Sequence, residues 1–148
     1  MRRLAAAALA VTAAVLLPAC GGGDSGGGTS KAAWQKKNGA LVSAYSRDLS
    51  DAVNTINQGQ RNETTGSCQQ VTDDANDLKK QAIPVPNSAV DAPLRKAVDL
   101  GLSAAGHCLK GAGSSGSEGA REVEAGQKDF ADARKSMDDA EAAINAWR

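Results

Sequence analysis

The chain of 148 residues is poor in the side chains on which enzymes and nucleic-acid-binding proteins depend. It has one histidine, His107, and four aromatic residues. A catalytic zinc ion needs about three protein ligands, and a serine or cysteine triad would depend wholly on His107. We therefore expect no metal, no cofactor and no enzymatic activity. The 17 basic and 17 acidic residues balance, and without a basic stripe we expect no binding to nucleic acid.

An apolar run long enough to cross a membrane is also missing. The stretch Leu4–Leu17 has 14 residues, whereas a spanning helix needs about 20. Arg2 and Arg3 precede this stretch and Leu17-Pro18-Ala19-Cys20 closes it, which is the order found in an export signal. We therefore expect residues 1–19 to be a cleaved signal peptide and Cys20 to become the first residue of the mature chain.

Residues 20–30 predict a flexible tether that follows the cleavage point. Six of the ten residues from Gly21 to Ser30 are glycine, and such a segment cannot bury enough apolar surface to fold. A flexible coil of this length spans roughly 17 Å on average. The remaining residues, 31–148, are expected to form a single folded domain.

From residue 31 onward, apolar side chains recur at helical spacing, and no run alternates as a strand would. The pattern predicts an all-α fold, an antiparallel four-helix bundle, with helices at about 31–58, 67–82, 91–110 and 118–147. The two outer helices would reach about 40–45 Å and the two middle ones about 22–28 Å. Because of this mismatch, we expect the outer helices to overhang or one of them to bend.

Several residues predict where these helices begin and end. Ser30 is the expected N-cap of the first helix, and Gly59 is expected to stop it. Ser67 and Gln70 form a candidate capping box at the start of the second helix. A start near residue 91 would keep Pro93 in the first turn of the third helix, where its missing N–H costs least. A flexible Gly/Ser loop is expected at 111–117.

Two cysteines, Cys68 and Cys108, remain beside Cys20. Both lie on the apolar stripes of their helices, and in an antiparallel pair their levels match within about 3 Å. An exported chain meets oxidising conditions, so we expect an inter-helix disulfide. It would stabilise the domain by about 4 kcal/mol in the chain-entropy model. A redox pair, or a metal site with His107, are the alternatives.

Two acidic clusters stand out on the second and last helices. Their spacing predicts solvated faces with lysine and arginine nearby, and weak divalent-cation binding is the alternative. The clusters are Asp73, Asp74 and Asp77, and Asp138, Asp139 and Glu141.

Trp34 and Trp147 are expected to meet, because the first helix begins where the last one ends in such a bundle. Lys36, Lys37 and Arg148 are close to them in sequence. One interpretation is a membrane-facing foot, with indoles at headgroup depth and cations near anionic lipid. The other interpretation is that both indoles cap the core.

Three features occur together in the chain: the sequence Leu17-Pro18-Ala19-Cys20-Gly21, the Gly/Ser spacer, and a helical domain with Cys68, Pro84-x-Pro86 and Cys108 in this order. Together they resemble a recurrent type of small secreted lipoprotein from high-GC Gram-positive bacteria. The resemblance implies a diacylglycerol on the thiol of Cys20 and a lipid-anchored protein on the extracytoplasmic face of the cell membrane. It implies no activity.

These observations favour a non-enzymatic envelope lipoprotein that acts as a protein-interaction module at the cell surface. Bundles offer grooves for partner helices, and a tether restricts the search to the membrane neighbourhood. The alternative is a carrier that holds a small apolar ligand or a lipid within the bundle.

Overall fold

The computed structural model describes residues 30–59 and 61–148. Four helices make up nearly all of this part of the chain: α1 (Lys31–Gln58), α2 (Arg61–Gln81), α3 (Ser88–Gly113) and α4 (Gly116–Ala146). The predicted signal peptide, Cys20 and the tether up to residue 29 lie outside the described residues.

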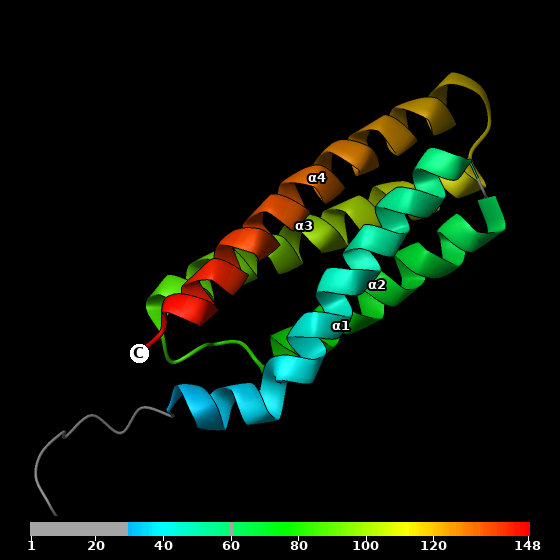
Figure 1. Cartoon of the computed structure of the whole chain (residues 1–148). Coiled ribbons are helices and arrows are strands. Elements are labelled where there is room, and N and C mark those ends of the chain that lie inside the picture. Colours follow the sequence, from blue (N-terminus) through cyan, green and yellow to red (C-terminus); the bar gives the residue numbers. More distant parts are fainter. Residues whose placement is uncertain (1–29, 60) are drawn as a thin grey trace, which may run out of the picture.

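The helices form the antiparallel four-helix bundle that the sequence predicts (Figure 1). Each helix packs against the next one in the chain, and α4 packs back against α1. The contact between α3 and α4 is the most extensive, and that between α1 and α4 is the smallest of these four. We call the end where residue 30 enters the bundle the proximal end, and the end with the α1–α2 and α3–α4 connections the distal end.

Helix α1 has the predicted bounds and the predicted caps. The Ser30 side chain accepts a hydrogen bond from the Ala33 N–H at 3.3 Å, which satisfies one of the free donors of the first turn. At the other end, Gly59 adopts the left-handed conformation with φ 67°. This conformation is strained for residues with a Cβ atom, so glycine is the natural stop.

Helix α2 begins at Arg61, six residues before its predicted start. The capping box at Ser67 and Gln70 was therefore a wrong prediction, since both residues lie inside the helix. The Gln70 side chain instead donates to Asp74 Oδ1, one turn on, at 3.0 Å. Residues 61–66 carry no apolar stripe that would mark them as helical. The tertiary contacts of the folded protein can make such a polar segment helical, and helix propensities do not include these contacts.

Helix α3 begins at Ser88 instead of near residue 91, because Asn87 is the effective N-cap. The Asn87 side chain accepts from the Ala89 N–H at 2.9 Å. Pro93 consequently lies in the second turn and not in the first. Asp91 is left to accept from the Val85 N–H at 2.7 Å, which holds the α2–α3 loop against α3.

The predicted 111–117 loop is largely helical. Helix α3 continues to Gly113 and α4 begins at Gly116, so only residues 114 and 115 separate them. The four helices have 28, 21, 26 and 31 residues, which makes them more even in length than the sequence predicts. Helix α1 still bends, and its first turns cross below the bundle toward the end of α4 (Figure 1).

The core is built from aliphatic and small side chains around one tyrosine. The apolar stripes predicted for α2 and α3 are buried throughout. Tyr45 is fully buried, and its hydroxyl donates to the Ala97 carbonyl at 2.8 Å. A Cβ atom at Gly101 would collide with this hydroxyl, so glycine is what lets the ring lie against α3. The largest fully buried side chains are Tyr45, Phe130, Leu49, Leu78, Leu94, Met137, Val71, Val90, Val98 and Cys68.

Candidate functional site

An open groove of about 470 Å³ lies at the distal end, where all four helices begin or end. Most of the residues that line it are small or apolar. Ile56 belongs to α1, Thr64 to α2, Cys108 and Gly111 to α3, and Val123 to α4. The groove is thus a product of the topology, because two helix connections that are distant in sequence, α1–α2 and α3–α4, meet around it.

Two glycines allow α3 and α4 to lie close together beside the groove. A Cβ atom at Gly111 would lie 2.8 Å from Val123 Cγ2, and one at Gly119 would lie 2.9 Å from the Ser114 carbonyl oxygen. Both distances are too short for a side chain to fit unless the neighbouring atoms move. The backbones of α3 and α4 therefore approach closely here, and part of the groove wall is backbone instead of side chain.

One charged residue, Glu124, lines the groove. Its side chain is exposed, and no ion pair joins it to the described side chains. Nearby, the Gln127 side chain donates to Asn57 Oδ1 at 3.3 Å and links α4 to α1. The arrangement can accept an apolar group with a hydrogen-bond donor or a cation beside it.

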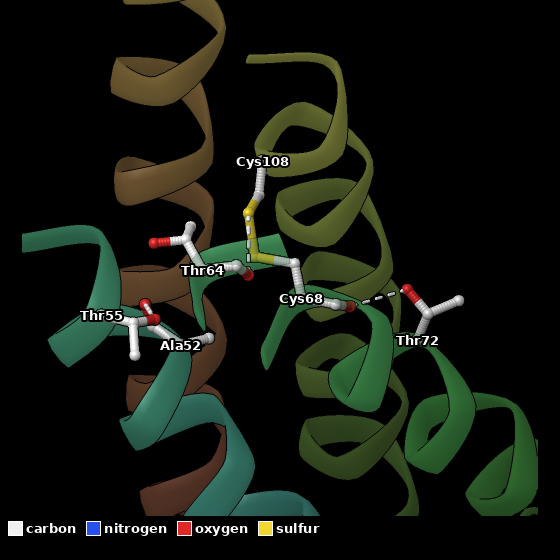
Figure 2. Close-up of a disulfide and its surroundings, with 6 residues drawn as sticks. All are labelled: Ala52, Thr55, Thr64, Cys68, Thr72 and Cys108. Atoms are coloured by element: carbon white, nitrogen blue, oxygen red, sulfur yellow. Dashed lines mark hydrogen bonds between the residues drawn. A yellow bond between two sulfur atoms is a disulfide. The ribbon is translucent and has the colours of Figure 1, made fainter. Parts of the chain in front are cut away.

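The predicted bridge between Cys68 and Cys108 is confirmed and joins α2 to α3 near the groove (Figure 2). The two Cα atoms lie 6.4 Å apart, and both cysteines are buried. Next to the bridge, the Thr72 hydroxyl donates to the Cys68 carbonyl at 3.0 Å. Cys108 lines the groove, so the bridge braces the end of the molecule at which the groove opens.

His107 pairs with an acid and not with the cysteines. Its Nδ1 lies 2.6 Å from Glu122 Oε2, which connects α3 to α4. This hydrogen bond lowers the pKa of the Glu122 carboxyl below its usual value. One turn away, the Ser103 hydroxyl donates to Asp129 Oδ2 at 2.7 Å, so the hydroxyl does not use the imidazole as its acceptor.

Neither a metal cluster nor a membrane span is found within the described residues. No group of three or more histidine, cysteine, aspartate or glutamate side chains there is placed to hold a metal ion. No helix there has both the length and the apolar character to cross a bilayer.

The acidic cluster of α2 is not wholly solvated, and the prediction was wrong for Asp74. Asp73 is exposed, but Asp74 is half-buried, and its Oδ2 atom is buried without a hydrogen bond from another described group. Burial raises the pKa of Asp74 above its ordinary value, and the neighbouring carboxyl of Asp48 in α1, to which a protonated Asp74 could donate a hydrogen bond, raises it further. Two neighbouring carboxyl groups favour a shared proton. In the second cluster, Asp138 and Asp139 are exposed as predicted, whereas Glu141 is half-buried.

Trp34 and Trp147 meet at the proximal end, with their ring centroids 5.8 Å apart. Trp34 is only 4% exposed, and its indole N–H donates to the Ala82 carbonyl at 3.3 Å. It thus packs as a core side chain, which is the second of the two interpretations that the sequence left open. Trp147 is half-buried at the rim, and membrane contact through its indole stays a prediction.

Sequence reasoning located the bridge and the meeting of the two tryptophans but missed the groove and the Asp48–Asp74 pair. Gly111 and Gly119 are the signal for close helix approach, although the sequence places Gly111 in a predicted loop (111–117) and Gly119 in the predicted last helix. No family model matches the chain, and no curated protein or solved structure matches it either.

Proposed function

We propose that the chain is a lipid-anchored, non-enzymatic protein of the bacterial cell envelope that binds a protein partner through the distal groove. One observation carries this proposal: residue 30 enters the bundle at the end opposite the groove. A chain held by an acylated Cys20 on the extracytoplasmic face of the membrane would present the groove away from the lipid. The mean span of roughly 17 Å predicted for residues 21–30 would leave this orientation free of the bilayer.

The form of the groove suits a protruding apolar side chain of another protein. Its walls combine Ile56 and Val123 with the backbone of Gly111 and Gly119, so an inserted side chain would be surrounded by apolar atoms. Residues that anchor an interface generally fill pockets of this kind, and surrounding contacts exclude water from them. The carboxylate of Glu124 at the rim could pair with a lysine or arginine side chain of the partner.

Site-specific crosslinking in cells tests the groove directly. A photoreactive amino acid at Ala120, an exposed groove residue, should capture one defined protein that peptide sequencing can identify. The matched control places the same group at Ala131, which is exposed on α4 and does not line the groove. Equal capture of the same proteins from both positions would contradict the proposal.

The anchor needs a separate test. Cells fed with labelled palmitate should incorporate label into the wild-type chain and not into the Cys20→Ala variant. An unlabelled mature protein, or a chain that remains in the cytosol, would refute the anchoring part of the proposal.

A carrier of a small apolar ligand is the second candidate, and the size of the groove favours it. A volume of about 470 Å³ lies within the range of about 300–1,000 Å³ typical of small-molecule sites. Native mass spectrometry of the purified protein should then show a bound lipid or other apolar molecule, which the groove-filling variant Ala120→Trp should lose. A wild-type protein that carries no added mass would count against the carrier.

A further inference from the structure

The basic residues of the bundle are concentrated at the proximal end. We take this end as residues 30–40, 78–96 and 140–148, which the antiparallel topology brings together. These segments hold two acidic side chains, Asp91 and Glu141, and eight basic ones. The basic residues are Lys31, Lys36, Lys37, Lys79, Lys80, Arg95, Lys96 and Arg148.

The rest of the bundle has the opposite charge. Residues 41–59, 61–77 and 97–139 hold seven basic and fourteen acidic side chains. Asp77, Asp99, Asp138 and Asp139 lie just beyond these limits, and Asp99 pairs with Lys79. The excess of basic residues is therefore confined to the tip of the proximal end, where it can attract an anionic surface.

Most of the proximal cations are available for a partner. Within the described residues, Lys79 pairs with Asp99 at 2.8 Å and Arg95 pairs with Asp91 at 2.6 Å. Lys36, Lys37, Lys80 and Lys96 are exposed, and none of them forms an ion pair with a described side chain. Their charges are thus not used to hold the bundle together.

We propose that the proximal end docks on the anionic phospholipid headgroups of the membrane that anchors the chain. This inference rests on the proposed anchoring, because the ten residues 21–30, with a predicted mean span of roughly 17 Å, would keep the proximal end close to the lipid surface. Separations shorter than this mean would place the basic end inside the surface potential, which decays over about 8–10 Å at physiological salt. Docking would hold the bundle upright and keep the acidic, groove-bearing end pointing outward.

The contact is made by cations and not by the two indoles together. Trp34 is buried and bonded to the Ala82 carbonyl, so it stabilises the surface from which the lysines project. Lys36 and Lys37 lie on the bent first turns of α1, directly after the residues at which the tether enters. Each basic residue near an anionic surface strengthens binding about fivefold.

The test uses residues 20–148 with Cys20→Ser, which contain the four helices and the described core but cannot be acylated. This protein should co-sediment with vesicles of one part phosphatidylglycerol to three parts phosphatidylcholine, and not with pure phosphatidylcholine vesicles. The triple variant Lys36→Gln, Lys37→Gln, Lys80→Gln should bind about a hundredfold more weakly. The matched control, Lys110→Gln, Arg134→Gln, Lys135→Gln, removes the same charge outside the proximal end and should bind at least as well as the parent protein.

Several outcomes would overturn the docking proposal. These are equal binding to both kinds of vesicle, an equal loss of binding in the two triple variants, or soluble inorganic polyphosphate that binds better than lipid phosphate. Circular dichroism of each variant shows whether it is folded, and a pair of single variants, Lys36→Gln and Lys80→Gln, replaces any triple variant that is not. Because the protein used cannot be acylated, vesicle binding and palmitate labelling succeed or fail independently.

Discussion

The two ends of the bundle are held together by different means. At the proximal end, Trp34 and Trp147 pack against each other, and backbone carbonyls accept from the indole of Trp34 and from Lys31. At the distal end, the Cys68–Cys108 bridge stands next to an open groove. A chain with four aromatic residues thus uses ring packing to stabilise one end and a covalent bond to stabilise the other, and both ends keep an open pocket at the surface.

Removal of the bridge should produce the largest effect. The double variant Cys68→Ala, Cys108→Ala should lose about 4 kcal/mol of stability, because the unfolded chain regains the entropy of a loop with a sequence separation of 40. Thermal unfolding followed by circular dichroism measures this loss, and hydrogen exchange should rise more at the distal end than at the proximal end. A melting temperature equal to that of the oxidised wild type would show that the bridge does not stabilise the fold.

Trp34→Ala tests how the proximal end is stabilised. Truncation of a buried tryptophan should cost about 3 kcal/mol, since it removes apolar contacts and leaves the Ala82 carbonyl without its donor. Trp147→Ala is the matched control and should cost less, because Trp147 is half-buried. Urea unfolding compares the two midpoints, and a larger shift for Trp147→Ala would reverse the assigned roles.

Asp74→Asn concerns the middle of the bundle, between the two ends, and its effect depends on pH. The pKa of Asp74 is raised above its ordinary value of 3.8 by burial and by hydrogen bonding to Asp48. The folded state then binds this proton more tightly than the unfolded state does. The resulting stabilisation is fully present below the ordinary pKa and is lost as the pH rises through the raised one.

The variant should therefore flatten the decline in stability that the wild type shows as the pH rises from about 4 toward neutrality. The measurement is a series of urea unfolding curves across this range. Asp73→Asn, one residue away on the exposed face, is the control and should leave the decline unchanged. If both variants changed the pH profile equally, the decline would not come from the Asp48–Asp74 pair.

Two glycines near the distal end should give the smallest effects, with opposite signs. Gly66 lies inside α2 with open space around it, so Gly66→Ala should stabilise the protein by about 0.4–1 kcal/mol. Gly116 has a φ of 67°, so Gly116→Ala should destabilise it by about 1 kcal/mol. Chemical unfolding resolves such differences, and two changes of the same sign would contradict the assigned backbone conformations.

Local signals in the sequence were sufficient for the number and order of the helices, for the bounds of α1 and for the bridge. The bounds of α1 follow from a serine cap and a glycine stop, and the stripe Leu94, Ala97, Gly101, Ala104 and Cys108 of α3 is buried as predicted. The bridge could be predicted because two cysteines on apolar stripes have matching heights in an antiparallel pair.

Features that depend on how helices are placed relative to one another were not predictable. The early start of α2 at Arg61 has no apolar periodicity to mark it. Whether Asp74 faces water or Asp48 is decided by the rotation of α2 against α1, and a shift of one residue in sequence turns a helical side chain by about 100°. The groove is formed by the ends of four helices together, so it cannot be predicted from any single segment of the sequence.

The bridge between α2 and α3 has a consequence for proteolysis. The segment 82–87, which joins these two helices, is the longest connection between described helices. A protease that cut there would leave an N-terminal piece with α1 and α2 and a C-terminal piece with α3 and α4. The cystine would keep the two pieces in one molecule until a reductant separated them, so the nicked protein should migrate as a single species on a gel without reductant and as two with it.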